Sequence, residues 1–204
     1  TTTTIDFSVF NCLKEITGDF HIDDNVTLTT IEGFAKLNHV GGNFHIKENT
    51  KLLTIPGFES LTNVDGNLGI FSNDALLTIP GFAVLTKVNG NFDIIENIEL
   101  LTIPGFASLT NVYGNFDINE NTELLTISRF VSLTIVVGDF LVFMNAALLT
   151  ITGFGTLKQI GGNFRIEEND ALETIEKFTE LRTVSGDFFI FNNIKLDTIL
   201  DFSN

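Results

Sequence analysis

The chain is poor in several residues that small extracellular domains depend on: it has one cysteine, Cys12, and no tryptophan among 204 residues. A single cysteine excludes an internal disulfide framework, so packing has to stabilise the fold. No apolar run approaches the length of about 18 residues that a membrane span requires, so we expect no membrane insertion. The N-terminal stretch TTTTIDF lacks the basic and apolar regions of a signal peptide.

Positively charged residues are also scarce. The 11 Lys and Arg stand against 26 Asp and Glu, which gives a formal net charge of −15. An acidic surface repels phosphate backbones and anionic lipids, so we expect no nucleic acid partner. The acidic residues fall at repeat positions that we expect to face solvent.

Signals of catalysis are nearly absent. The chain has three His in total, and it contains no G-x-S-x-G motif, no P-loop and no paired cysteines. Because the acidic residues are best interpreted as a solvated surface rather than a catalytic pair, we predict that the protein is not an enzyme. We also predict no cofactor and no bound metal.

What the chain does have is a repeat. Residues 52–73, LLTIPGFESLTNVDGNLGIFSN, reappear 24 residues later as LLTIPGFAVLTKVNGNFDIIEN and then as LLTIPGFASLTNVYGNFDINEN. A period of this length is typical of a solenoid, and we call one 24-residue unit a coil. We predict a single domain with an irregular N-terminal cap (1–27), seven regular repeats (28–195) and a truncated last repeat (196–204). Since no C-terminal cap is evident, we expect the chain to be a fragment of a longer one.

Two columns of the repeat are complete in all eight coils. We expect glycine to supply either a positive φ or a close backbone approach at a corner, and asparagine to bond turn backbone and the neighbouring asparagine. The glycines are Gly18, Gly42, Gly66, Gly90, Gly114, Gly138, Gly162 and Gly186. The asparagines are Asn25, Asn49, Asn73, Asn97, Asn121, Asn145, Asn169 and Asn193.

Two different apolar spacings occur within each coil. Leu68 and Ile70 alternate with polar positions, which predicts a short strand that pairs in parallel with its copies in adjacent coils. Upstream, apolar residues recur every three positions, which favours extended, 3₁₀-like or turn-rich structure over an α-helix. All three prolines, Pro56, Pro80 and Pro104, share one column there, so we expect them to lie outside the sheet ladder.

The pattern LxxIxxFxxLxxVxGxFxIxxN resembles leucine-rich repeats, and more closely the receptor L-domain type of repeat. The resemblance covers almost the entire chain. It implies a mainly β fold, a right-handed leucine-rich-repeat β-solenoid of about eight 24-residue coils with a parallel sheet on one face. Such repeats occur in many surface and secreted binding proteins, so we expect an extracellular or cell-surface location. The chain lacks the disulfide-bonded caps and tryptophans of animal receptors, and no hormone- or growth-factor-binding residue is carried over from them.

Positions that vary from coil to coil are not determined by the repeating scaffold, so they are the candidates for functional residues. All but four of the 21 phenylalanines fill repeating positions, and the remaining four fall in outward strand columns. Clustered exposed aromatics mark interaction surfaces, although a flat β surface favours such residues anyway and a flanking segment could cover them. The predicted binding residues are Phe71, Ile95, Leu141, Phe143, Arg165, Phe189, Phe191, Asp93, Asp117 and Glu120.

Two groups on this face raise the question of metal. Asp93 and Asp117 lie in adjacent coils with Glu96 and Glu120, and a cation or basic partner would relieve their repulsion. No calcium-binding loop motif accompanies them, however. His21 and His45 are also neighbours across coils, and although imidazole suits transition metals, we interpret them as exposed histidines without a metal.

A threonine ladder offers a rival function. Thr30, Thr54, Thr78, Thr102, Thr126, Thr150, Thr174 and Thr198 form an unbroken column. Regular threonine arrays resemble ice-binding surfaces, but those have two ranks and this chain has one beside a column of leucines. We therefore predict a non-enzymatic recognition or adhesion module that binds protein or carbohydrate through its strand face. The alternatives are ice binding and a purely structural surface spacer. Self-association through the aromatic patch or an uncapped C-terminal end is a further expectation.

Overall fold

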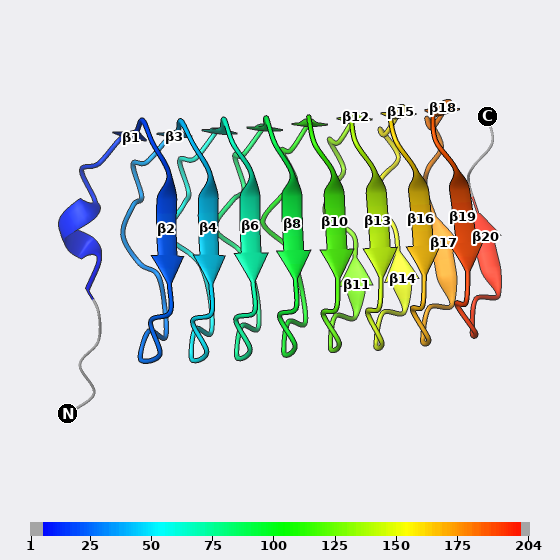
Figure 1. The fold of residues 1–204 in the computed structure, drawn as a ribbon, viewed down its shortest axis with the longest axis horizontal. Helices are drawn as coiled ribbons and strands as arrows, with labels where there is room; N and C mark the ends of the chain where they lie inside the picture. The colour runs from blue at the N-terminus through cyan, green and yellow to red at the C-terminus, as the bar shows by residue number, and fades with distance from the viewer. Residues whose placement is uncertain (1–5, 201–204) are drawn as a thin grey trace.

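The computed structural model describes residues 6–200, which wind into a β-solenoid of eight coils (Figure 1). Neighbouring coils pair with a constant offset of 24 residues, as in Phe92 against Phe116. The prediction of a mainly β solenoid of about eight 24-residue coils is confirmed. Residues 1–5 of the expected N-terminal cap and residues 201–204 of the expected truncated repeat, Phe202 included, lie outside the described residues.

The eight longest strands form one parallel sheet, which we call the long-strand sheet (Figure 1). Within each strand the first and third side chains point into the core, as the period-two pattern predicts; Phe44 and Ile46 are fully buried, whereas His45 and Lys47 are not. The strands are β2 (Phe20–Asp23), β4 (Phe44–Lys47), β6 (Leu68–Phe71), β8 (Phe92–Ile95), β10 (Phe116–Asn119), β13 (Phe140–Phe143), β16 (Phe164–Glu167) and β19 (Phe188–Phe191).

Residues 6–200 contain two further parallel sheets, which the sequence did not predict. The second sheet has one two-residue strand per coil and lies across the corner marked by the Gly column. Its strands are β1 (Glu15–Ile16), β3 (His39–Val40), β5 (Asn63–Val64), β7 (Lys87–Val88), β9 (Asn111–Val112), β12 (Ile135–Val136), β15 (Gln159–Ile160) and β18 (Thr183–Val184). The third sheet comprises β11 (Thr126–Ile127), β14 (Thr150–Ile151), β17 (Thr174–Glu176) and β20 (Thr198–Leu200).

The third sheet occupies only the C-terminal half of the solenoid and begins in the coil after the last of the three prolines (Figure 1). There the backbone N–H of Thr152 donates to the carbonyl of Ile127 at 2.8 Å. In the earlier coils Pro80 and Pro104 occupy the equivalent position and have no N–H to donate. Those coils make only isolated bridges, such as Thr54 with Thr78. The prolines thus lie outside the described strands, as predicted.

The asparagine column forms the predicted ladder. The N–H of each buried Asn donates to the Oδ1 of the next, as from Asn97 to Asn121 at 3.1 Å. The amide nitrogen of Asn97 also donates to the carbonyls of Ile70 and Ile95. The residue before each Asn has a positive φ, between 49° and 60°, although none of these residues is glycine. The asparagine bonds span this position, and they hold a conformation that other residues rarely adopt.

For the glycine column the structure selects one of the two predicted roles. Positive φ among glycines of residues 6–200 occurs only at Gly33 and Gly153, neither of which is in the column. The column instead permits close approach between coils. A Cβ on Gly66 would lie 2.7 Å from the carbonyl carbon of Gly42, and the N–H of Gly66 donates to that carbonyl at 2.9 Å.

The core is built from two stacks of phenylalanine. Phe58 and Phe82 stack face to face at 5.3 Å along the three-spaced side, and Phe92 and Phe116 do so at 5.1 Å beneath the long-strand sheet. The stacks meet edge to face, with the centroids of Phe92 and Phe106 4.8 Å apart. The short 3₁₀ helix η1 (Ser8–Phe10) lies against the first coil (Figure 1). These stacks fill the core directly behind the long-strand sheet.

Candidate functional site

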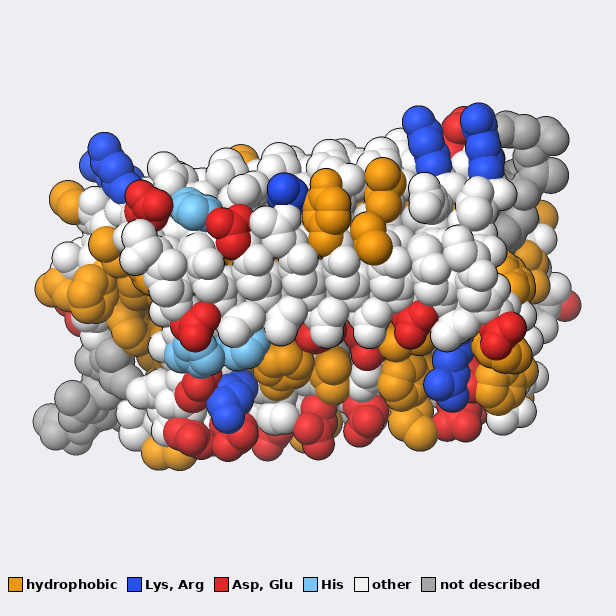
Figure 2. Space-filling model, turned by 45° about the horizontal axis from the view of Figure 1, so that its top comes forward, with side chains coloured by type: hydrophobic (Ala, Val, Ile, Leu, Met, Phe, Trp, Pro, Cys, Tyr) orange, Lys and Arg blue, Asp and Glu red, His pale blue; other side chains and the backbone are white. Residues whose placement is uncertain are grey.

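The outward side chains of the long-strand sheet form what we call the strand face. They occupy the second and fourth positions of each strand, and Figure 2 shows them as a mixed band of histidine, hydrophobic, acidic and basic side chains along the solenoid. The prediction that these columns point outward is correct for most coils. Asn119 and Glu167 are exceptions, because both side chains are buried despite their outward positions.

The ten predicted residues do not form one patch. Phe71 and Ile95 are register partners near the N-terminal half of the face. Asp117 and the buried Asn119 follow on β10 and separate this pair from the C-terminal group. The C-terminal group consists of Leu141, Phe143, Arg165, Phe189 and Phe191 on the consecutive strands β13, β16 and β19.

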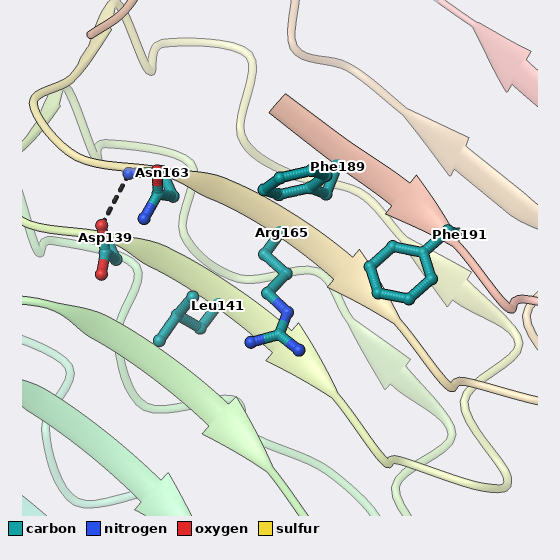
Figure 3. A pocket seen from close by; sticks show the side chains of 6 residues that line it. All are labelled: Asp139, Leu141, Asn163, Arg165, Phe189 and Phe191. Atoms are coloured by element: carbon teal, nitrogen blue, oxygen red, sulfur yellow. Dashed lines mark hydrogen bonds between the residues drawn. The ribbon is translucent and has the colours of Figure 1, made fainter. Parts of the chain in front are cut away.

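Most of the C-terminal group surrounds an open pocket of about 320 Å³. We call it the Phe–Arg pocket, and its lining side chains are shown in Figure 3. Its lining residues are Asp139, Leu141, Asn163, Arg165, Phe189 and Phe191. Asp139 and Asn163 belong to a column that the sequence also places outward, but this column is Asn or Asp in every coil, so its members were not among the predicted binding residues. Phe189 and Phe191 are 43% and 41% exposed, whereas Phe71 and Phe143 are only partly exposed.

Arg165 is held in place from two sides. Its guanidinium forms an ion pair with Glu167 and lies over the ring of Phe143, 5.6 Å from the centroid. Glu167 is only 2% exposed, and its Oε2 has no hydrogen-bond partner. The expectation that acidic residues all face solvent is therefore wrong for Glu167. Its register neighbours in the ladder are Phe143 and Phe191, two bulky rings that shield the position between them from water.

Asp93 and Asp117 lie directly opposite one another on β8 and β10, as predicted. Burial, and then the charge of Asp117, raises the pKa of Asp93 to about 7. Burial also raises the pKa of Asp117, to about 6. A hydrogen bond from Asn119 acts in the opposite direction and lowers this pKa, whereas the charge of Glu120 raises it further. The pair is thus sensitive to pH close to neutrality.

His21 and His45 occupy the N-terminal end of the face. Their rings meet edge to face with centroids 4.9 Å apart, which confirms the predicted adjacency. Burial, and then His21, lowers the pKa of His45. Within residues 6–200 no group of three His, Cys, Asp or Glu side chains is arranged to hold a metal ion.

The threonine ladder lies away from the strand face. Most of its side chains are half-buried, and the hydroxyls of Thr78 and Thr102 are 3.2 Å apart. The neighbouring column projects further into solvent: its leucines are between 39% and 45% exposed, namely Leu53, Leu77, Leu101, Leu125 and Leu149. The threonine ladder is therefore one regular column of hydroxyl groups beside one column of apolar side chains.

Comparisons of the chain with protein-family models, with curated proteins and with solved structures give no match. Among the helices of residues 6–200, none is long and apolar enough to cross a membrane.

Proposed function

We propose that this chain is a leucine-rich-repeat module, related to the receptor L-domain type, that serves in recognition or adhesion without catalysis. Its strand face binds a protein or carbohydrate at the outside of a cell or at the cell surface. The observation that supports this proposal is the contrast between columns. The buried columns repeat almost without change, whereas the strand face varies from coil to coil and gathers Phe189 and Phe191 at a pocket.

The support beneath this face favours binding. Each strand of the long-strand sheet pairs with a neighbouring strand on both sides, except β2 and β19 at the two ends of the sheet. The asparagine ladder fixes the turn that follows each of these strands. A binding group on such a support loses little conformational freedom when a ligand arrives, so more of the contact energy appears as affinity. Aromatic side chains and arginine are also the residues that contribute most at binding surfaces.

The test is a double variant, Phe143→Ser with Phe191→Ser, assayed on a glycan array and on a panel of extracellular proteins. We expect the wild-type chain to bind at least one member and the variant to lose about tenfold or more in affinity. Tyr113→Ser is the matched control, because Tyr113 is an exposed ring directly after β9 of the second sheet, outside the strand face. Unchanged binding by a folded double variant would show that the strand face is not the binding site.

A second candidate function is ice binding, and the unbroken register of the threonine ladder favours it. This alternative expects thermal hysteresis in the wild-type chain and its loss when Thr102 and Thr126 are replaced by Tyr. Absence of hysteresis in the wild-type chain rejects it. A purely structural spacer is the remaining alternative, and it expects neither hysteresis nor any partner.

A further inference from the structure

The walls of the Phe–Arg pocket are aromatic. The rings of Phe189 and Phe191 stand 6.2 Å apart between centroids at an angle of 76°. Two nearly perpendicular rings offer a ligand one face to lie on and one edge to lie against. The volume of about 320 Å³ lies at the lower end of the range for small-molecule sites, so the pocket suits a single ring-sized unit.

The rim of the pocket offers one fixed acceptor and one fixed donor. Asp139 Oδ1 accepts the N–H of Asn163 at 2.6 Å, which orients the carboxylate and leaves Oδ2 for a ligand. Asn163 Oδ1 accepts the N–H of Asp187 at 2.8 Å, which leaves its amide Nδ2 as a donor. Figure 3 shows both side chains along one side of the pocket, near Leu141. A hydroxyl donates and accepts at once, so a hydroxylated ligand can serve both groups.

Charge adds one constraint on the ligand. The pocket carries the carboxylate of Asp139 and the guanidinium of Arg165, which is paired with Glu167. A ligand with a single charge of either sign is attracted by one of these groups and repelled by the other. An uncharged, hydroxylated ligand is repelled by neither group and can form hydrogen bonds with both.

We propose that the Phe–Arg pocket binds an uncharged hexose unit of an oligosaccharide or polysaccharide. The apolar C–H face of the sugar ring stacks on Phe191 or Phe189, and its hydroxyls bond Asp139, Asn163 and Arg165. This inference rests on the proposed recognition function and names carbohydrate, rather than protein, as the ligand class.

The test uses the whole chain on an array of neutral glycans and on insoluble cellulose, chitin, xylan and β-glucan. The affinity of any retained glycan is then measured by calorimetry with the released oligosaccharide. We expect Phe191→Ala to weaken binding about tenfold or more, because stacking on one ring contributes most of the apolar contact. Asp139→Asn should weaken it about threefold to tenfold, since it replaces one acceptor.

The controls distinguish an effect on the pocket from an effect on the stability of the fold. Asp139→Asn retains the Oδ1 that accepts from Asn163, and asparagine already fills this column at Asn91 and Asn115. Tyr113→Ala removes an exposed ring on another face and should leave binding unchanged. Because the ligand is uncharged, affinity should also change less than twofold when salt is raised, unlike that of a charged peptide.

Three outcomes would overturn the inference. Retention by no glycan of the panel rejects the carbohydrate class, and equal retention of wild type and Phe191→Ala rejects the pocket. A strongly salt-dependent affinity indicates a charged ligand. If the chain retains no glycan but binds a protein, and the Phe143→Ser and Phe191→Ser double variant loses that protein binding, the recognition function stands and the carbohydrate ligand class is wrong. If binding to both ligand classes is unchanged in those variants, the strand face is not the binding site. If the wild-type chain binds neither class, the recognition function itself is contradicted.

Discussion

Arg165 and Glu167, two residues apart on β16, form an ion pair in which one partner is exposed and the other is only 2% exposed. The carboxylate lies in an outward column of the long-strand sheet, but the rings in the two neighbouring coils enclose it. A buried charge is tolerated where a partner neutralises it, and it becomes costly when that partner is removed. Arg165 is thus a structural residue as well as a member of the pocket.

Arg165→Met should lower the free energy of unfolding by about 2–4 kcal/mol, because Glu167 is left buried and unpaired. Glu167→Gln should cost less than about 1 kcal/mol, and the double variant should recover most of the loss caused by Arg165→Met. Urea denaturation of the wild type, the two single variants and the double variant measures the coupling. Additive effects would contradict the structural role of the pair.

Asn121→Ala should lower the free energy of unfolding by about 3–5 kcal/mol, because it leaves the buried N–H of Asn97 without its acceptor and removes a side-chain donor from the carbonyl of Ile94. Asn193→Ala is the matched control in the last coil, where the side chain is partly exposed; there we expect a loss of about 1 kcal/mol. Urea denaturation compares the two. Equal losses would argue against burial as the source of the ladder's stability.

Gly114→Ala should destabilise the fold by about 2 kcal/mol or more, since the new Cβ would lie 2.7 Å from the carbonyl carbon of Gly90. Gly18 occupies the same column in the first coil, and a Cβ there meets no atom within 4 Å. Gly18→Ala should therefore be neutral or slightly stabilising. Melting temperatures measure the difference, and similar values for the two variants would reject close approach as the role of the column.

Asp93→Asn should stabilise the protein in a manner that depends on pH. The pKa of Asp93 is raised to about 7 in the folded state, so the wild-type fold binds this proton more tightly than the unfolded chain does. The stability that wild-type Asp93 contributes is present at acidic pH and is lost as the pH rises from about 4 to 7. The advantage of the Asn variant should therefore grow over that interval and level off above it, at about 1–3 kcal/mol.

Urea denaturation at pH 4, 5.5 and 8 checks this course, and the difference between variant and wild type removes the contribution of the carboxylates that do not interact with Asp93. Asp74→Asn, which changes an exposed carboxylate, is the control. A difference that is already complete at pH 4, or that shrinks as the pH rises, would contradict the prediction.

The repeat explains why so much of the fold is predictable from sequence. Once the period is known to be 24, every residue has known neighbours one coil away, and the pairs Asp93–Asp117 and His21–His45 follow directly. Buried columns are equally direct, since the repeating Phe and Asn face the same surroundings in every coil. The predicted outward columns of the strand face rest on the same reasoning.

The remaining features depend on contacts between residues that do not repeat. Glu167 is buried because the rings of Phe143 and Phe191 and the guanidinium of Arg165 surround it, and the residues of its own column do not predict this burial. The pocket forms where variable residues such as Phe189 and Arg165 lie beside Asp139 and Asn163, whose column is Asn or Asp in every coil and so does not stand out. The third sheet depends on whether a coil has proline or an N–H donor at one position, and its extent follows only from the backbone geometry there.

The asparagine ladder has one more consequence, for how such a molecule can change its length. Each coil presents the same acceptor to the coil before it and the same donor to the coil after it. A duplicated or deleted stretch of 24 residues therefore restores the asparagine bonds across the junction, whereas an insertion of another length within a coil would shift the residues that follow it out of this register. The unit that evolution or an engineer can add is the whole coil, and each addition extends the strand face by one more row of freely variable positions.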